Sequence, residues 1–392
     1  MHVPLLLLAL VGHGFLWIGL VNRLHALGIR RRIISVLTVV FFLCASLLPI
    51  AIGCWFLERA GLELPHASAG TPMELVIGVY LLLCWIVAPV TLVRAVWLRT
   101  VLRRPSILRF HRRRAVAIDP AGAALSPEEN RHHFAARLPL NEILRLEVTD
   151  RVIDVPRLAP ALDGLSIVHL SDLHFTGRIG KAYFREVVRV TNELRADLIL
   201  ITGDMVDKPA CLEWVADTLG QLSAPAGVYF ILGNHDLRVG GDVLRRKLEQ
   251  CGLNHVGGRW RRIEIKGAPV VLAGNERPWI TPAADMQDCP PPAPAGPLRI
   301  VLAHTPDQLG WARAHDADLL LTGHTHGGQI RIPPLGAILS PTLSGVKYIS
   351  GVYYVRPTIL HVTRGVSGDV PVRWNCPPEI AHLTLRAART TA

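Results

Sequence analysis

The chain has 392 residues, half of them hydrophobic, and a formal net charge of +11. It is too apolar for an ordinary soluble domain and long enough for a sizeable core together with a membrane-embedded part. Residues 1–114 hold 13 Arg or Lys and three Glu, a net charge of +10, whereas the other 278 residues hold 29 basic and 28 acidic side chains. The basic residues therefore indicate membrane flanks and disfavour a nucleic-acid partner.

Three apolar runs at residues 3–21, 33–57 and 75–93 predict membrane-spanning helices. Each is close to the ~20 residues that a helix needs to cross a bilayer, and none is clearly amphipathic. A buried core helix is the alternative for any one run, but three together favour spans. A signal peptide is the alternative for the first run, but Met1 and His2 provide no positively charged n-region, so the run is predicted to be a span. Residues 1–98 are thus predicted to be a transmembrane region of about three helices.

The arginines around these runs predict the topology. Four lie between the first two runs, one lies between the second and third, and eight follow the third before residue 115. The positive-inside rule then predicts a multi-pass protein of the inner cell membrane, with the N-terminus outside and everything after residue 93 cytoplasmic. Residues 99–142 are predicted to be a basic juxtamembrane segment and linker, whose arginines lie against anionic headgroups.

Residues 143–392 are predicted to form one α/β domain. Short apolar runs end in polar residues, as in SIVHLSDLH, DLILITGD, VYFILGNHD, RIVLAHTPD and DLLLTGHTH. Helical stretches at 181–195, 211–222 and 242–251 separate the first runs, which predicts βαβ units with polar residues at the carboxyl ends of the strands. After residue 326, VYYVRPTILHVT and IAHLTL predict a mostly β second half that packs as another sheet. Residues 289–297, CPPPAPAGP, predict a surface loop or polyproline stretch.

Polar side chains collect at the ends of five predicted strands: Asp172, His174, Asp204, Asn234, His235, Asp236, His304, His324 and His326. Each has an ordinary alternative, such as a helix cap for Asp172, turn formation for Asn234 or Asp236, and a satisfied core position for His304. Together they are expected at one edge of the sheet. The seven cysteines are scattered without a CxxC pair, so the donors are nitrogen and oxygen, which suit Mn, Fe, Zn or Co.

The blocks D-x-H, G-D, G-N-H-D, a single H and G-H-T-H, in this order, resemble the calcineurin-like metallophosphoesterase superfamily. The flanks LDGLSIVHLSDLHF and GHTHGGQIRIP resemble its membrane-anchored bacterial branch, and the resemblance covers about residues 144–385. It implies an α/β fold in which a two-sheet β-sandwich is flanked by helices. It also implies two metal ions, the first held by Asp172, His174 and His326, the second by Asn234, His304 and His324, with Asp204 bridging both.

The same resemblance implies that His235 lies beside the scissile phosphate and that Asp236 orients it. Two cations about 3.5–4 Å apart can share a hydroxide and bind the phosphoryl oxygens, so that water attacks phosphorus in line. A histidine beside an acidic residue can protonate the leaving alkoxide, for ~10²–10⁴ in rate. The neutral Asn234 limits the negative charge that an anionic substrate meets. The sequence thus predicts a metal-dependent phosphoesterase acting on a phosphomonoester, phosphodiester or pyrophosphate.

The two histidines of GHTHGGQI are expected to have separate partners. Alternation along an extended chain turns His324 and His326 to similar sides, so that they reach neighbouring metals. Gly323 and the pair Gly327 and Gly328 permit close turns around them.

The sequence alone leaves open the substrate, the metal, the oligomeric state and the class of function. A lipid-linked substrate is a hypothesis that rests on membrane anchoring, and the sequence predicts neither the metal nor the oligomeric state. A membrane scaffold or sensor with little catalysis is the alternative function, and a nuclease is disfavoured by the near-neutral domain. Asp207 and Arg178 lie near the motifs but are interpreted as structural or solvated.

Overall fold

The computed structural model describes residues 3–59, 71–100, 106–116, 118, 138–292, 296–333 and 335–388. Residues 101–105, 117 and 119–137 of the predicted linker, and residues 293–295 of the proline-rich stretch, lie outside the described residues. The chain divides into two compact units, Met1–Arg103 and Arg104–Ala392.

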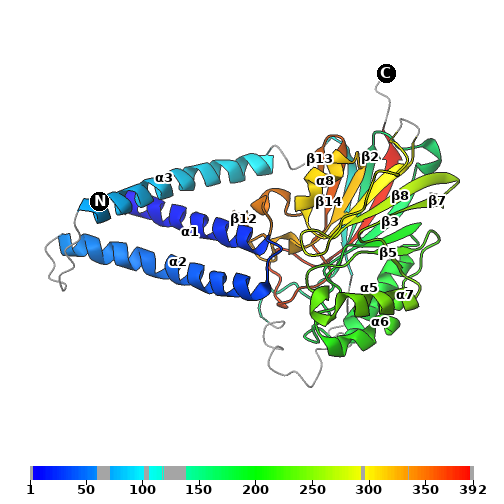
Figure 1. Cartoon of the computed structure of the whole chain (residues 1–392), viewed down its shortest axis with the longest axis horizontal. Helices are drawn as coiled ribbons and strands as arrows, with labels where there is room; N and C mark the ends of the chain where they lie inside the picture. Colours follow the sequence, from blue (N-terminus) through cyan, green and yellow to red (C-terminus); the bar gives the residue numbers. More distant parts are fainter. Residues whose placement is uncertain are drawn as a thin grey trace. The chain divides into compact units, whose positions relative to one another are not determined.

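The first unit consists of three long helices, α1 (Val3–His25), α2 (Arg31–Arg59) and α3 (Thr71–Thr100), as predicted (Figure 1). Their apolar windows have mean hydropathies of 2.1, 2.6 and 2.5, so each is long and apolar enough to cross a membrane. Many of their large apolar side chains point outward, as for Phe42 at 68% exposed. Pro49 and Pro89 lie inside α2 and α3, where membrane helices tolerate proline better than soluble ones do.

The second unit contains two main sheets. The first has the strand order β1-β2-β15-β3-β4-β5-β6, and its strands are β1 (Leu108–Ala115), β2 (Glu147–Val155), β3 (Leu165–Leu170), β4 (Leu198–Ile201), β5 (Val228–Phe230), β6 (Asn254–His255) and β15 (Glu379–Ala387). From β3 to β6 all neighbours are parallel, because helices return the chain between them. These helices are α5 (Lys181–Glu193), α6 (Trp214–Asp217) and α7 (Gly241–Gln250).

The second sheet has the order β13-β14-β10-β9-β8-β7. Its strands are β7 (Trp260–Ile265), β8 (Ala268–Asn275), β9 (Leu298–Ala303), β10 (Leu319–Thr322), β13 (Gly351–Val355) and β14 (Thr358–Val362). Strands β8, β9, β10 and β14 run parallel, and α8 (Leu309–Ala314) connects β9 to β10. A small antiparallel pair, β11 (Arg331–Ile332) and β12 (Gly336–Ala337), follows the GHTH motif in the chain.

Alternation along the strands builds the layers. In β4, Leu198 and Leu200 join a core that also contains Ile300 and Leu302 of β9, so the two sheets pack face to face. The other β4 positions, Ile199 and Ile201, pack with residues of α5 and α7 on the opposite face. A third cluster packs α8 on the outer face of the second sheet. The predicted two-sheet sandwich flanked by helices is confirmed.

Three details of the predicted domain were wrong. The last run, IAHLTL, belongs to β15, which inserts between β2 and β3 of the first sheet. The second sheet also draws β7 to β10 from before residue 326. The stretch 211–222 is a single helix in the prediction, but it breaks into the short helix α6 between two 3-10 turns, Pro209–Glu213 and Leu219–Gln221.

Candidate metal centre

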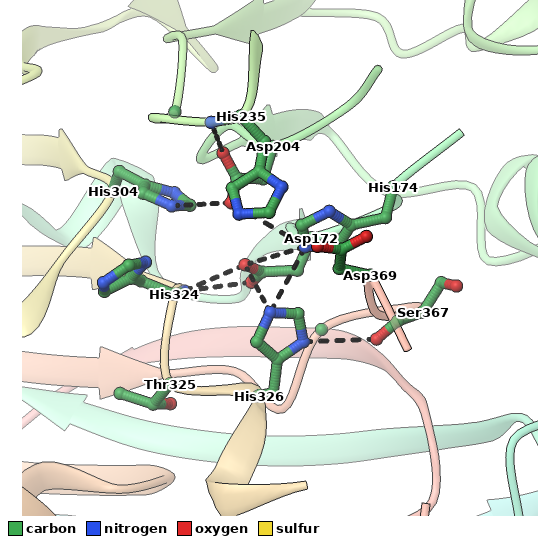
Figure 2. A network of polar contacts seen from close by, with 12 residues as sticks. Asp172, His174, Asp204, His235, His304, His324, Thr325, His326, Ser367 and Asp369 are labelled. Atoms are coloured by element: carbon green, nitrogen blue, oxygen red, sulfur yellow. Dashed lines mark hydrogen bonds and ion pairs between the residues drawn. The ribbon is translucent and has the colours of Figure 1, made fainter. Parts of the chain in front are cut away.

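The predicted site residues come from both sheets. Asp172 and His174 follow β3, Asp204 follows β4, and Asn234 and His235 follow β5 of the first sheet. His304 follows β9, and His324 and His326 follow β10 of the second sheet. The expectation that all five strand ends share one sheet edge was therefore wrong. They converge because the two sheets pack together, and Figure 2 shows the side chains gathered between the loops.

Five of these residues have a left-handed backbone. Their φ values are 54° for Asp172, 49° for His174, 55° for Asp204, 66° for His324 and 49° for His326. Non-glycine residues adopt this region at a cost of order 1–3 kcal/mol each, and such strain concentrates at functional sites. The local backbone is thus arranged to turn these side chains inward.

One group of donors combines the D-x-H motif with the last histidine. Asp172, His174 and His326 each offer a ligand atom within 4.8 Å of the others. The Nε2 atoms of His174 and His326 are 3.2 Å apart, and Asp172 Oδ1 lies 3.6 Å from His326 Nε2. Asp172 also accepts the backbone N–H of His324, through Oδ1 at 3.1 Å and Oδ2 at 3.0 Å, which ties the two sheets' loops together.

A second group contains Asp204, His304 and His324, again within 4.8 Å of one another. His304 Nε2 lies 3.1 Å from Asp204 Oδ2. Asp204 Oδ2 also lies 3.7 Å from His174 Nε2, so this carboxylate stands between the two groups. His324 and His326 therefore belong to different groups, as predicted. They do so through positive φ angles and a 3-10 turn at His326–Gly328, and not through extended alternation.

Hydrogen bonds fix which ring nitrogen of three histidines faces the centre. His304 Nδ1 lies 2.7 Å from the Thr202 carbonyl and His324 Nε2 lies 3.0 Å from the Pro341 carbonyl, so each of these nitrogens donates its proton outward. His174 Nδ1 lies 2.8 Å from Asp207 Oδ2. The remaining nitrogens, Nε2 of His304 and His174 and Nδ1 of His324, are the ones left to bind a metal once they carry no proton, as in metal-binding histidines whose other nitrogen donates to the protein.

The pKa shifts report the same demand for positive charge. Burial lowers the pKa of His304, but the charge and hydrogen bond of Asp204 outweigh it and raise the value to about 9. Burial likewise opposes protonation of His174, whereas its bond to Asp207 and the nearby carboxylates raise its pKa to about 9. At His326, by contrast, burial outweighs the nearby carboxylates and lowers the pKa to about 3. The buried carboxylates thus favour positive charge beside His304 and His174 but do not protonate His326.

These residues fit a metal centre. Among the residues that the structure describes, Asn234 Oδ1 is buried and has no hydrogen-bond partner, while His304 Nε2 faces only the Asp204 carboxylate, at 3.1 Å. Buried polar atoms normally find a partner, so an unpaired carbonyl oxygen near a cluster of carboxylates and imidazoles suits a bound cation. The donor set is nitrogen and oxygen without thiolate, because none of the candidate groups contains a cysteine.

Residues 165–328 match the calcineurin-like phosphoesterase family. The chain is 32% identical to the phosphodiesterase YaeI of Escherichia coli (strain K12) over 225 residues, 56% of this chain and 81% of that protein. It belongs to the calcineurin-like phosphoesterase family. It is also 30% identical to the uncharacterized metallophosphoesterase YkuE of Bacillus subtilis (strain 168), over 62% of this chain and 86% of that protein. A transmembrane protein with metallophosphoesterase domain from Bos taurus is 32% identical over 62% of this chain and 57% of its own length.

The chain is therefore a metallophosphoesterase, a metal-dependent phosphoric ester hydrolase. Enzymes of this family use a dinuclear metal centre, and the two groups of donors described above are the candidates for it.

The structure corrects the role predicted for Asp236. Its carboxylate is fully buried and accepts four backbone N–H groups, from Asp204 and Gly233 through Oδ2, and from Met205 and Val206 through Oδ1. Burial and the charge of Asp204 raise the pKa of Asp236 to about 7. Asp236 thus joins the loops after β4 and β5 and makes no hydrogen bond to His235 in the described residues.

The carboxylate that hydrogen-bonds to His235 is Asp207, so its interpretation as solvated was wrong, whereas a structural role agrees with its buried position. Asp207 Oδ1 lies 2.5 Å from His235 Nδ1 and 2.6 Å from Arg238 Nη1, while Oδ2 faces His174. The spacing GDMVD, which puts Asp207 three residues after Asp204, was the available sequence signal. Arg178, by contrast, bonds to Asp369 and touches none of the predicted ligands.

A second missed residue is Arg373, which is fully buried. Its guanidinium donates to the carbonyl oxygens of His326 and Arg364 at 2.8 Å and to that of Ser367. It therefore fixes the loop that carries His326 against the loop after β14. No sequence motif marked it, because its partners are backbone carbonyls from distant segments.

Proposed function

We propose that the protein is a membrane-anchored metallophosphoesterase that hydrolyses a phosphodiester or pyrophosphate bond at a dinuclear centre. The observation that carries this proposal is Asp204, whose carboxylate stands between two separate groups of donors. In this proposal Asp172, His174 and His326 hold one ion, and Asn234, His304 and His324 hold the other. Asp204 bridges both. The name of the Escherichia coli relative, a phosphodiesterase, supports a diester over a monoester.

Two bound ions such as Mn, Fe, Zn or Co would supply charge for the phosphoryl oxygens and an activated water as nucleophile. The chain's own residues supply the rest. The side chains of His235 and His326 are 15% and 14% exposed, whereas those of His174, Asp204 and His304 are at most 1% exposed, so an incoming ester meets the first two. Of these two, His235 is the one outside the proposed ligand sets. Its Nδ1 is held by Asp207, which leaves Nε2 to donate a proton to the leaving alkoxide.

Arg238 lies against the same imidazole. Its Nη1 donates to Asp207 Oδ1 and its Nη2 donates to His235 Nε2 at 3.0 Å, so Nε2 is an acceptor in the free enzyme. An incoming anionic ester would draw the guanidinium away, after which Nε2 can take up the proton that it gives to the leaving alkoxide. A guanidinium at this point offers a second positive contact to an anionic substrate, and Asp207 balances its charge in the free enzyme.

Membrane anchoring is proposed from α1, α2 and α3, from the basic flanks, and from the transmembrane relative in Bos taurus. The arginine distribution supports a catalytic unit on the cytoplasmic side of the inner membrane. A catalytic unit held at a bilayer favours a lipid-linked phosphoric ester, and the near-neutral charge of residues 115–392 disfavours nucleic acid. The oligomeric state is not part of the proposal.

The test is turnover of an aryl phosphodiester by the full-length protein with added manganese, together with metal analysis. We expect about two ions per chain, and a loss of about 10²–10⁴ in turnover for His235→Ala without loss of metal. If the wild type and His235→Ala both bind metal and are equally inactive, the alternative of a metal-binding scaffold or sensor is correct.

A second experiment tests the substrate and the anchoring. Phosphate-ester hydrolysis is compared between a lipid diphosphate and soluble nucleotide diesters, and turnover of the nucleotide diesters alone would remove the lipid-linked substrate. Alkaline carbonate extraction of membranes should leave the protein in the pellet, and its release into the supernatant would contradict spanning helices.

A further inference from the structure

Apolar side chains are exposed on the segments that follow the site histidines in the chain. We define the apolar rim as Ile330, Ile332, Leu339, Leu343, Val370 and Trp374, which are between 37% and 55% exposed. Scattered single exposed apolar residues need no explanation, but a contiguous patch on a folded domain marks an interaction surface. The question is therefore whether these six residues are contiguous.

Backbone contacts join them. Ile330 forms a parallel bridge with Trp374, and β11, which includes Ile332, pairs with β12. Gln329 Nε2 donates to the carbonyl oxygen of Val370 at 2.8 Å. A side chain on Gly328 would come within 3.4 Å of the carbonyl oxygen of Leu339, so that segment also lies against the turn. These contacts bring the segments of Ile330, Ile332, Leu339, Val370 and Trp374 together, and Leu343 follows Leu339 by four residues in the chain.

This surface borders the candidate metal centre. His324 donates to the carbonyl oxygen of Pro341, which lies between Leu339 and Leu343 in the chain. Val370 directly follows Asp369, whose carboxylate lies within 4.8 Å of ligand atoms of Asp207 and His235. An ester that reaches His235 therefore passes close to the apolar rim.

The carboxylates beside the rim have partners. Asp369, which precedes Val370, pairs with Arg178 at 3.3 Å and with Arg238 at 3.5 Å, and Asp307 accepts the backbone N–H of Leu343 at 2.8 Å. From Leu319 to Gly368 the sequence contains no Asp or Glu, and Arg331 and Lys347 in this stretch keep partial exposure. An apolar surface with an exposed tryptophan, basic neighbours and paired carboxylates suits the headgroup region of an anionic bilayer, where Trp is enriched.

We propose that the apolar rim docks onto the bilayer that holds α1, α2 and α3, so that the centre opens at the membrane interface and receives amphiphilic phosphoric esters there. The tether makes this docking an intramolecular event, for which a modest apolar surface suffices. The proposal rests on the membrane anchoring proposed above and is independent of the reaction catalysed.

The direct test is photocrosslinking of the full-length protein in vesicles of phosphatidylethanolamine and phosphatidylglycerol that carry alkyne-labelled acyl chains. p-Benzoylphenylalanine replaces Leu339, Trp374 or, as a control of similar exposure on α7, Val243, which is 45% exposed. We expect lipid labelling from positions 339 and 374 at least about fivefold above that from position 243, because only an inserted side chain meets acyl chains.

Labelling at the level of position 243 would overturn the proposal. So would crosslinks from position 339 to the chain's own helices or to a second copy, since either would identify a protein partner for the rim. These outcomes are readable even if the protein hydrolyses no tested ester, so failure of the catalytic proposal is distinguishable.

A kinetic arm uses the double variant Leu339→Asp with Leu343→Asp, and Val243→Asp as control. We expect KM for a vesicle-borne phosphodiester to rise about tenfold in the double variant, because two carboxylates are repelled by the anionic surface. Turnover of a soluble aryl phosphodiester stays unchanged, which also reports that the variant is folded. Equal KM values for the vesicle-borne ester in double variant and wild type would contradict the docking.

Discussion

Asp207 Oδ1 lies 2.5 Å from His235 Nδ1, so a carboxylate outside the predicted ligand set orients the candidate proton donor. The other oxygen of the same carboxylate bonds to His174. The Asp207 side chain therefore connects His174, a candidate metal ligand, to His235, the candidate proton donor. A residue that hydrogen-bonds to a metal ligand without binding the metal can in this way influence the chemistry of the centre.

Asp207→Asn should lower turnover of an aryl phosphodiester by about 10–100-fold, the range that residues supporting metal ligands show. The amide keeps the shape but loses the charge that orients both imidazole rings. Steady-state kinetics with metal analysis check this, and Asp217→Asn, an exposed carboxylate that bonds to Lys181, is the control. Full activity in Asp207→Asn would remove the positioning role.

Asp204→Asn should abolish binding of at least one of two metal ions, because it removes charge from the only carboxylate shared by both groups among the described residues. Elemental analysis of the purified variant measures this directly. Asp242→Asn, whose carboxylate is exposed on α7, should keep the wild-type metal content. Retention of both ions by Asp204→Asn would contradict a bridging carboxylate.

Gly323→Ala should damage the centre by steric conflict. A Cβ at this position would lie 2.0 Å from Ser171 Oγ and 2.3 Å from Asp172 Oδ2, so the carboxylate must move. We expect reduced metal content together with a roughly 10–100-fold fall in turnover, as for displaced ligands. Gly310→Ala is the matched control, since a Cβ there meets nothing within 4 Å. Wild-type metal content in Gly323→Ala would show that the neighbours can give way.

The stability of the catalytic unit should fall in acid because of His169. This ring is fully buried, with Nδ1 2.9 Å from His361 Nδ1, and burial lowers its pKa to about 3. Above the unfolded value of ~6.5 the group is neutral in both states and has no effect. As the pH falls below that value only the unfolded chain binds the proton, so the free energy of unfolding decreases by about 1.4 kcal/mol per pH unit.

His169→Asn should therefore flatten the pH dependence of unfolding between pH 6 and about 4.5. Denaturant unfolding of metal-free protein in detergent, with EDTA present, measures the slope and removes the contribution of metal release. His315→Asn, which replaces a half-buried histidine on the outer layer, controls for the loss of any histidine. An equal slope in wild type and His169→Asn would contradict the assignment.

Predictions from the sequence were correct for features that depend on one local segment of the chain. Hydropathy predicted α1 to α3, and the polar residues after each apolar run identified the candidate ligands, because both signals are local. It failed where the outcome depends on which strands become neighbours. The position of β15 beside β3 depends on pairing over about 200 residues of sequence, as Leu383 opposite Ile167 illustrates.

The same distinction applies to the centre. Asp236 and Asp207 both follow a candidate ligand closely in sequence, so nothing local separates their roles. Their different functions come from the turns after β4 and β5, which aim Asp236 at four backbone N–H groups and Asp207 at His174 and His235. Arg373 acts through carbonyl groups, which every residue carries, and so no residue pattern announces it.

The insertion of β15 between β2 and β3 also sets an order of events during synthesis. The helices that could enter the membrane leave the ribosome first, while β3, whose end carries Asp172, gains its antiparallel neighbour only when residues 379–387 have been made. A nascent chain already inserted in the bilayer would therefore carry an unfinished centre. Metal loading is then expected only after residues 379–387 have joined the sheet.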